Sequence, residues 1–215
     1  MPLPRRGNSA TRVKTPSADA FYRLVAARRG HFQLESGHHG ALWFDLDDLF
    51  ASHWRIAPFV AQLVALLRPH EVQIVCGPLL GGAFLAQLVA QSLGAEFCFT
   101  QRTVVGQPGA LFGAEYRLPH AYSARVHGAR VAMVDDVMSA GSALRGTHAE
   151  LLRHGAIPVV AGAMLVLGRT GADHLLRERI AVVSVASEPY DLWLPSACPL
   201  CRSGPPLEHI AATPA

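Results

Sequence analysis

The chain has 215 residues, of which 50% are hydrophobic and 16% are charged, and this is the balance of one compact domain with a substantial core. It excludes a chain that is disordered throughout, a solenoid and a collagen-like fibre. The formal charge of +3 reflects four cations within residues 1–16, where there is no acid; without them the count is 15 cations against 16 acids. The body of the chain is therefore near neutral, which argues against a nucleic-acid-binding groove.

Features at the ends and along the chain indicate a cytoplasmic protein. No uninterrupted apolar run reaches the roughly 18 residues of a membrane span, and the N-terminus lacks the hydrophobic stretch of a secretion signal. The four cysteines are too few and too unevenly spaced for the disulfide framework of a small secreted domain. We expect residues 1–16 to be a disordered basic tail and residues 17–215 to be a single domain.

The predicted elements begin with a short helix that Ser17 caps and that Gly30 ends with a left-handed stop. Two alternating stretches, 31–36 and 41–46, then predict a small hairpin around the loop SGHHG. Helices and strands alternate afterwards, in the order helix 53–68, strand 72–76, helix 82–93, strand 95–100, strand 129–136, helix 142–154, strand 157–168, helix 171–178 and strand 179–187. This alternation predicts an α/β fold with a parallel sheet covered on both faces. Residues 102–113, rich in glycine, indicate a mobile loop or a long β-hairpin beside the site.

The segment 131–143, VAMVDDVMSAGSA, combines an apolar strand, two carboxylates and a turn of small residues before a helix. The turn can direct several backbone N–H groups at one phosphate, helped by the helix N-terminus. Its residues are Ser139, Ala140, Gly141, Ser142 and Ala143. Asp135 and Asp136 would instead accept hydrogen bonds from sugar hydroxyls, with Mg²⁺ nearby to offset their charge. The segment predicts a ribose-5-phosphate site; the alternative is that the acids cap the turn and the small residues only allow close packing.

A second glycine-rich connection, GPLLGG, follows the strand 72–76. Its glycines allow the backbone to approach a ligand closely before the next helix begins, which suits a pyrophosphate. The residues concerned are Leu79, Leu80, Gly81 and Gly82. A tight strand-to-helix connection without a ligand is the alternative.

VAMVDDVMSAGSA closely resembles the phosphoribosyl-pyrophosphate (PRPP) motif of the type I phosphoribosyltransferases. Over about residues 18–207 the order of features is similar to that of the orotate phosphoribosyltransferases, whose Leu-Lys-Ser-Gly loop and aromatic strand are matched by Leu34, Ser36, Gly37, Trp43, Phe44 and Asp45. Arg169 stands where that family has an arginine that reaches the pyrimidine, with Gly168 in place of an acid. The tail CPLCRSGPPL, residues 198–207, also resembles the ending of many bacterial members.

The resemblance implies a type I phosphoribosyltransferase fold, with a parallel sheet flanked by helices and a small N-terminal hood built by the first helix and hairpin. It implies Mg²⁺-dependent transfer of ribose 5-phosphate from PRPP, which carries most of the Mg²⁺, to orotate in a homodimer. The implied catalytic residues are Asp135, Asp136 and Arg102, the last acting from across the dimer. The implied base-binding residues are Ser36, Gly37, Trp43, Phe44 and Arg169. For Trp43 and Phe44 the alternative is a packing role in a half-buried strand, and for the two arginines it is surface solubility.

Two departures from the family pattern keep alternatives open. Glu35 replaces the family's lysine, and this charge reversal favours a neutral or cationic base over orotate. The loop that begins at Arg102 and Thr103 lacks the family's lysines and histidine, whose charge neutralises departing pyrophosphate. The alternatives are a phosphoribosyltransferase for another nitrogenous base and a non-catalytic PRPP-binding regulator.

The pair Cys198 and Cys201 has the separation of half a zinc site, and Cys76, Cys98 and His209 are the candidates to complete one. We expect a structural or incidental thiol pair and no metal site, with a metal or a regulatory disulfide as alternatives. The neighbours His38 and His39 lie in the candidate base-binding loop, where we expect them to be solvated.

Overall fold

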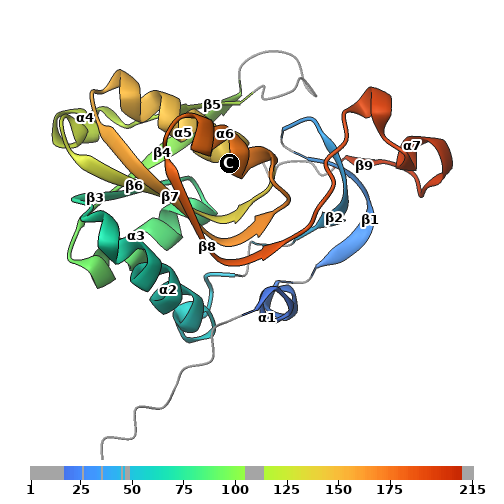
Figure 1. The fold of residues 1–215 in the computed structure, drawn as a ribbon, viewed down its shortest axis with the longest axis horizontal. Helices are drawn as coiled ribbons and strands as arrows, with labels where there is room; N and C mark the ends of the chain where they lie inside the picture. Colours follow the sequence, from blue (N-terminus) through green and yellow to red (C-terminus); the bar gives the residue numbers. More distant parts are fainter. Residues whose placement is uncertain are drawn as a thin grey trace, which may run out of the picture.

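The computed structural model describes residues 17–25, 27–34, 36–44, 46, 49–104 and 114–209. These residues form a six-stranded sheet with helices on both faces and a three-stranded sheet beyond the carboxyl ends of its strands (Figure 1). The predicted tail, residues 1–16, lies outside the described residues. In the part of the chain that is described, no helix has both the length and the apolar content needed to cross a membrane.

The central sheet has the strand order β5-β4-β3-β6-β7-β8. Its strands are β3 (Ile74–Pro78), β4 (Glu96–Val104), β5 (Ala114–Arg117), β6 (Arg130–Met138), β7 (Ile157–Leu167) and β8 (Ala181–Glu188). All neighbouring strands are parallel except the edge strand β5, which is antiparallel to β4. The predicted parallel α/β sheet is therefore confirmed.

Helices cover both faces of this sheet and enclose two hydrophobic cores. The helices that follow the hood are α2 (His53–Leu67), α3 (Gly81–Leu93), α4 (His120–Val126), α5 (Ser142–Arg153) and α6 (Thr170–Arg177), with a 3₁₀ turn, η1 (Arg68–His70), after α2. The strand β6 is buried on both sides: Ala132 and Val134 belong to the core under α2 and α3, whereas Val131 and Met133 belong to the core under α5. A strand covered on both faces needs such a continuous apolar run.

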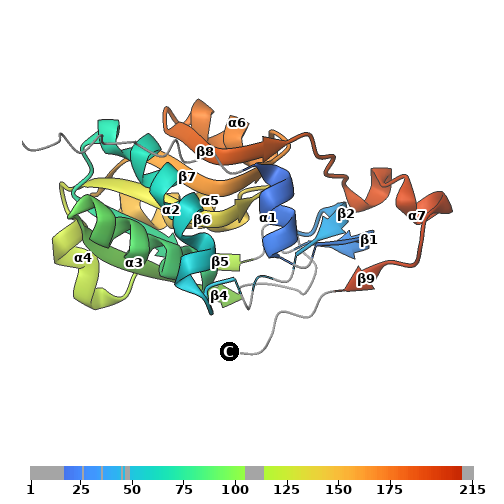
Figure 2. The same ribbon diagram turned by 90° about the horizontal axis from the view of Figure 1, so that it is seen from below.

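The hood lies beyond the carboxyl ends of the central strands, as the two ribbon views agree (Figures 1 and 2). It comprises α1 (Ala18–Leu24), β1 (Arg28–Gln33), β2 (His39–Trp43) and the short C-terminal strand β9 (Glu208–His209). The strands β1 and β2 form the predicted antiparallel hairpin, and β9 adds to β1 in parallel. Between β8 and β9 lie η2 (Pro195–Ala197) and α7 (Leu200–Ser203). The contribution of β9 was not predicted, because a two-residue strand leaves no periodic pattern.

The prediction that Gly30 ends the first helix is wrong. Ser17 caps α1 as expected, accepting a hydrogen bond from the Ala20 amide at 3.2 Å, but the backbone is already extended at Val25. Gly30 lies within β1, where a Cβ would stand 2.8 Å from the Phe32 ring. Pairing with β2 therefore places Gly30 and its neighbours in the sheet. Gly30 leaves room for the Phe32 ring and does not end a helix.

The segment between β4 and β5 begins and ends as an antiparallel pair, with Arg102 opposite Tyr116 and Thr103 opposite Glu115. Of the two predicted forms, the paired ends agree with a β-hairpin. The middle of the segment, residues 105–113, lies outside the described residues.

Candidate active site

The two carboxylates of the PRPP-like motif lie near the carboxyl end of β6 and are buried, with Asp135 9% and Asp136 6% exposed. The Asp136 amide donates to Asp135 Oδ1 at 3.1 Å, and the Val137 amide donates to Asp136 Oδ1 at 2.7 Å. Burial raises the pKa of Asp136, although hydrogen bonds with the Val137 amide, the Asp135 side chain and its own backbone oppose the effect. A partly desolvated carboxylate pair of this kind attracts sugar hydroxyls or a cation.

The glycine-rich connection after β3 packs directly onto this acid pair. A Cβ on Gly81 would lie 2.0 Å from Asp136 Oδ2, and a Cβ on Gly82 would lie 2.8 Å from Asp135 Oδ1. The Leu79 amide donates to the Thr100 carbonyl at 2.8 Å, and the peptide bond between Leu79 and Leu80 is cis. The structure thus brings together two motifs about 50 residues apart in the chain, because β3 and β6 are parallel neighbours.

The predicted phosphate turn joins β6 to α5. Gly141 has φ of 74°, a left-handed conformation that favours glycine, and a Cβ there would lie 2.9 Å from the Gly171 Cα. The Ser139 carbonyl accepts a hydrogen bond from the Gly171 amide at 3.0 Å. Because α5 begins at Ser142, its unpaired N-terminal N–H groups lie at this turn, and they suit an anion.

The hood loop carries the predicted base-binding residues Ser36 and Gly37, both of which are buried. Gly37 has φ of 79°, and its amide donates to the Leu34 carbonyl at 2.8 Å. The Ser36 hydroxyl hydrogen-bonds to the His38 ring at 3.1 Å. Burial lowers the pKa of His38, and the nearby charge of Arg145 on α5 adds to this effect. The charge of Arg145 on the helix after the phosphate turn therefore acts on the hood loop.

Comparison with known sequences relates the chain to one enzyme family over almost its whole length. The orotate phosphoribosyltransferase of Desulforamulus reducens is 29% identical over 188 residues, which cover 87% of this chain and 91% of the relative. An orotate phosphoribosyltransferase of Thermus thermophilus is 28% identical over 193 residues, which cover 89% and 98%. The chain is a distant homologue of the orotate phosphoribosyltransferases. No protein-family model matches it.

Solved structures show the same architecture. Orotate phosphoribosyltransferase from Aeropyrum pernix matches with a TM-score of 0.59 and 23% identity, over 75% of this chain and 88% of that one. The adenine phosphoribosyltransferase of Giardia lamblia, complexed with 9-deazaadenine, matches with a TM-score of 0.63 and 17% identity, over 80% and 97%. The chain therefore has the type I phosphoribosyltransferase fold, as the resemblance implied.

The two aromatic residues of the orotate phosphoribosyltransferase-like strand are half-buried and already have ring partners. The Arg28 guanidinium lies over the Trp43 ring at 5.7 Å, and Phe44 stacks on Tyr22 with 5.7 Å between ring centroids and 19° between planes. These contacts agree with the packing interpretation. A role for either ring in contacting a base stays a prediction.

The two arginines that the phosphoribosyltransferase pattern singles out lie on different elements. Arg102 is exposed on β4, at the start of the β4–β5 hairpin. Arg169 precedes α6, where its Nε and one terminal nitrogen donate to the Asp173 carboxylate at 3.3 and 3.2 Å. Glu35 and Asp45 lie outside the described residues.

Gly168 stands where the orotate phosphoribosyltransferase pattern has an acid, and its surroundings exclude a side chain. It has φ of 65°, and a Cβ there would lie 2.4 Å from the Tyr190 carbonyl oxygen. Sequence reasoning missed Tyr190, whose hydroxyl donates to the Leu42 carbonyl at 3.2 Å and accepts from the Leu42 amide at 3.3 Å. Tyr190 thereby fastens the hood strand β2 to the segment after β8. A tyrosine in a loop carries no sequence signal for this role.

His38 and His39 were expected to be solvated, and this prediction is wrong: both are buried, with 9% and 4% exposure. The strand β2 begins at His39, and both its amide and its carbonyl hydrogen-bond to Trp193, so the C-terminal segment covers the pair. The His39 ring lies in a cluster with His31, Cys198 and Cys201. Cys76, Cys98 and His209, the residues considered as further ligands beside the two cysteines, do not join that cluster.

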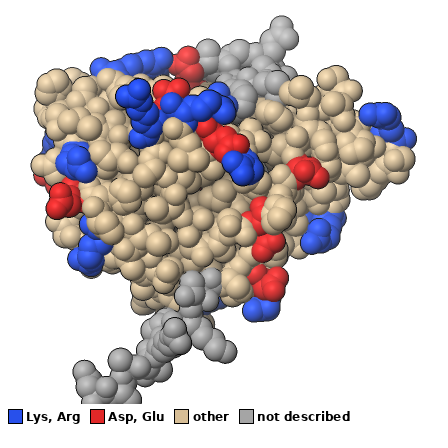
Figure 3. Space-filling model, in the orientation of Figure 1, with Lys and Arg blue, Asp and Glu red and all other residues tan. Residues whose placement is uncertain are grey.

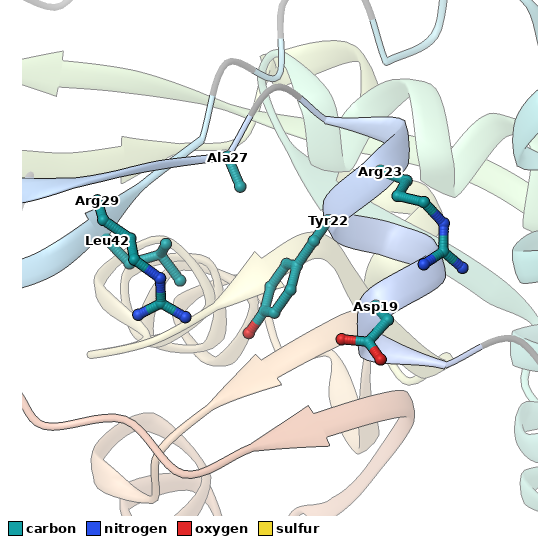
Figure 4. Close-up of a pocket in the computed structure, with 6 residues that line it drawn as sticks. All are labelled: Asp19, Tyr22, Arg23, Ala27, Arg29 and Leu42. Carbon is teal, nitrogen blue, oxygen red and sulfur yellow. The ribbon is translucent and has the colours of Figure 1, made fainter.

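A cavity of about 310 Å³ lies between α1 and the hood strands (Figure 4). Tyr22 from α1 and Arg29 from β1 point into it, with Asp19 on the helix side. Burial, followed by the charge of Glu188, raises the pKa of Tyr22. No described residue of the predicted active site lines this cavity. On the face of the molecule shown in Figure 3, acidic and basic side chains are interspersed over a mostly uncharged surface.

Proposed function

We propose that this protein is a cytoplasmic, homodimeric enzyme that transfers ribose 5-phosphate from PRPP to orotate, giving orotidine 5′-phosphate and pyrophosphate. One observation carries the proposal: Gly81 and Gly82 lie against Asp136 and Asp135, beside the 139–143 turn. A phosphate-binding turn, a buried carboxylate pair and a glycine-rich loop for a second anion are the three elements that PRPP requires. The distant orotate phosphoribosyltransferase relatives support orotate as the acceptor.

Different residues at the sheet edge bind different parts of PRPP. The N–H groups of the turn 139–143 bind the 5-phosphate, helped by the N-terminus of α5. Asp135 and Asp136 accept hydrogen bonds from the ribose hydroxyls. The backbone of residues 79–82 binds pyrophosphate, and the absence of a Cβ on Gly81 and Gly82 lets this loop lie directly against Asp136 and Asp135.

The carboxylate oxygens of Asp135 and Asp136 are hard donors of the kind that Mg²⁺ prefers, and both side chains are buried at the sheet edge, where an unpaired negative charge is costly and a cation is favoured. They would hold a Mg²⁺ that arrives with PRPP, which supplies neutralising charge for the pyrophosphate as it leaves. Departure of pyrophosphate builds positive charge on the anomeric carbon, so holding base and sugar in line lowers the barrier.

The hood and the hairpin complete the site in this proposal. Ser36 and Gly37 contact the base from the hood loop, and Arg169 joins them by leaving Asp173, an exchange that costs little because its side chain is 85% exposed. Arg102 of the partner subunit neutralises the leaving pyrophosphate.

A second candidate is transfer to a different base, which Glu35 favours because its carboxylate repels an anionic base more than a neutral one. A third is PRPP binding without catalysis, which the lack of lysine and histidine in residues 102–113 favours. A panel of orotate, uracil, adenine, hypoxanthine and guanine with PRPP and Mg²⁺ separates the three. We expect orotidine 5′-phosphate and pyrophosphate in equal amounts. A different nucleotide supports the second candidate, and bound PRPP without any nucleotide supports the third.

The variant Glu35→Lys tests whether orotate or another base is the natural acceptor. If orotate is the natural acceptor, another cation already compensates Glu35, and kcat/KM for orotate changes little. If the acceptor is another base, the wild type is nearly inactive on orotate and the variant gains activity. A large loss of orotate activity in the variant contradicts both accounts of this residue.

A further inference from the structure

Four potential metal ligands from both ends of the chain converge in the hood. His31 on β1, His39 on β2, Cys198 after η2 and Cys201 on α7 each offer one ligand atom, and these atoms all lie within 4.8 Å of one another. His31 Nε2 lies 3.1 Å from His39 Nδ1, 3.4 Å from Cys198 Sγ and 3.7 Å from Cys201 Sγ. Cys201 Sγ lies 3.3 Å from His39 Nδ1.

These separations are four of the six edges of a tetrahedron, and they have the lengths that zinc requires. With Zn–N of about 2.0–2.1 Å and Zn–S of about 2.3 Å, tetrahedral geometry places the two nitrogens about 3.3 Å apart and each nitrogen about 3.5 Å from each sulfur. The observed nitrogen–nitrogen separation is 3.1 Å, and the nitrogen–sulfur separations given above run from 3.3 to 3.7 Å. One ion at the centre would therefore reach all four atoms without rearrangement of the backbone.

Hydrogen bonding alone does not account for the cluster. The Nδ1 atom of His31 lies 3.1 Å from the Pro205 carbonyl, an acceptor, so this nitrogen carries the proton and donates it there. The Nε2 atom of His31 is then left with a single lone pair, yet His39 Nδ1 and both sulfurs crowd around it. A carbonyl that fixes the tautomer of a histidine in this way is the usual outer partner of a metal-bound imidazole.

Burial also fits a structural metal. His31 is 1%, His39 4% and Cys198 2% exposed, whereas Cys201 is exposed and leaves an entry path. Two imidazoles and two thiols surround one point, and no fifth histidine, cysteine or acid among the described residues joins them. This set matches a closed, structural zinc site and not a catalytic one.

We propose that His31, His39, Cys198 and Cys201 bind one Zn²⁺, which cross-links the C-terminal segment to the hood. The ion would reinforce the β1–β9 pairing and the Arg28–Glu208 ion pair at 2.8 Å, which also link this segment to β1. His39 is two residues from Gly37, so the zinc site would also order the hood loop. This site is separate from Asp135 and Asp136, and it corrects the expectation of an incidental thiol pair if the ion is found.

The test measures metal on the full chain, purified under reducing conditions without chelator, and needs no substrate. We expect about one zinc per chain by mass spectrometry. Cys201→Ser, at an exposed position, and His39→Asn should each weaken zinc binding at least about tenfold in competition with a chromophoric chelator. The control is His209→Asn, which changes a histidine of the same sheet that hydrogen-bonds to Gln33 and should retain zinc.

Cobalt substitution checks the geometry independently of folding of any variant. Co²⁺ added to the metal-free wild-type chain should give the intense visible bands of a tetrahedral thiolate site. Three results would overturn the proposal: fewer than about 0.1 zinc per chain after incubation with zinc salt and desalting, wild-type zinc affinity in both ligand variants, or the weak spectrum of six-coordinate cobalt. Since PRPP binding is measured separately, failure here leaves the proposed function standing, and the reverse also holds.

Discussion

Gly81 lies so close to Asp136 that a Cβ on the glycine would stand 2.0 Å from the carboxylate oxygen Oδ2. The loop proposed for pyrophosphate and the acid pair proposed for ribose are therefore in direct contact. Any side chain at position 81 must displace the carboxylate, the loop or both.

Gly81→Ala should consequently weaken PRPP binding by about tenfold or more, since a displacement of about 1 Å at a substrate-positioning group has effects of this size. Titration calorimetry with PRPP and Mg²⁺ measures the change. The matched control is Gly94→Ala at the other end of α3, where φ is 71° but no atom lies within 4 Å of the added Cβ. The control should lose about 1 kcal/mol of stability and keep PRPP affinity. Equal PRPP affinities in the two variants would show that the loop does not belong to the PRPP site.

PRPP with Mg²⁺ should stabilise the wild-type protein. At a hundredfold excess over Kd the gain is about 2.7 kcal/mol, which appears as a rise in melting temperature. Asp135→Asn combined with Asp136→Asn keeps the side-chain volumes but removes both charges, so the rise should largely disappear. The exposed Asp191→Asn serves as the control. If the double variant responds to PRPP as the wild type does, the ribose assignment is wrong.

Orotate turnover should be slow and should depend on Arg102, the cation at the start of the β4–β5 hairpin. Arg102→Ala should lower kcat by about 10- to 100-fold, because a charge that stabilises the leaving group is lost. Thr103→Lys adds a cation at an exposed neighbouring position and should raise kcat. Arg125→Ala, at an exposed arginine paired with Glu96 at 3.5 Å, controls for loss of surface charge. Unchanged kcat in the Arg102 and Thr103 variants would show that the hairpin takes no part in the reaction.

Tyr190→Phe should loosen the hood. The substitution removes the hydroxyl that bonds both the carbonyl and the amide of Leu42, at a cost of about 1–2 kcal/mol in unfolding free energy. We expect KM for the base to rise more than KM for PRPP, because the hood carries the proposed base-binding loop. Tyr122→Phe on α4 is the control, because Tyr122 packs against the core under α5, whereas the hood residue Leu42 belongs to the core under α2 and α3. This variant tests whether any loss of a tyrosine hydroxyl has this effect. Parallel changes in both KM values would argue against a specific link through Tyr190.

Stability should depend on pH through Glu150, a buried carboxylate of α5 whose side chain is 5% exposed. Burial raises its pKa, but hydrogen bonds from the Leu118 amide, His154, Arg117 and Arg153 outweigh burial and leave the pKa lowered. The stabilisation is therefore present above the unfolded-state pKa and is lost as the pH falls through the folded-state value.

Glu150→Gln should accordingly cost about 1–3 kcal/mol in urea unfolding at neutral pH, and the difference from wild type should shrink below about pH 4. Glu96→Gln, at an exposed ion pair, should cost less than about 1 kcal/mol. A difference for Glu150→Gln that stays constant from pH 7 to pH 3 would show that the carboxylate charge contributes nothing.

The sequence alone determined the elements whose signals are local. The segment 131–143 predicts a strand, an acid pair, a phosphate turn and a helix within thirteen residues, and β6 and α5 follow that order. The alternation of apolar strands with helices likewise predicted the parallel sheet, and parallel neighbours place the ends of β3 and β6 at one edge. These strands, helices and turns depend on backbone preferences and on patterns of apolar residues, and both can be read from residues that are close together in the sequence.

Only the tertiary structure decided which distant residues meet. His31 and Cys198 are 167 positions apart, and the two-residue strand β9 pairs with β1 although neither end of the chain carries a signal for the other. The same holds for Tyr190, which bonds a residue 148 positions away, and for Gly30, which pairing in the sheet diverts from its helix-ending role. Contacts of this kind arise when the chain returns to the hood after β8, and their stability comes from buried surface and geometry that no local pattern encodes.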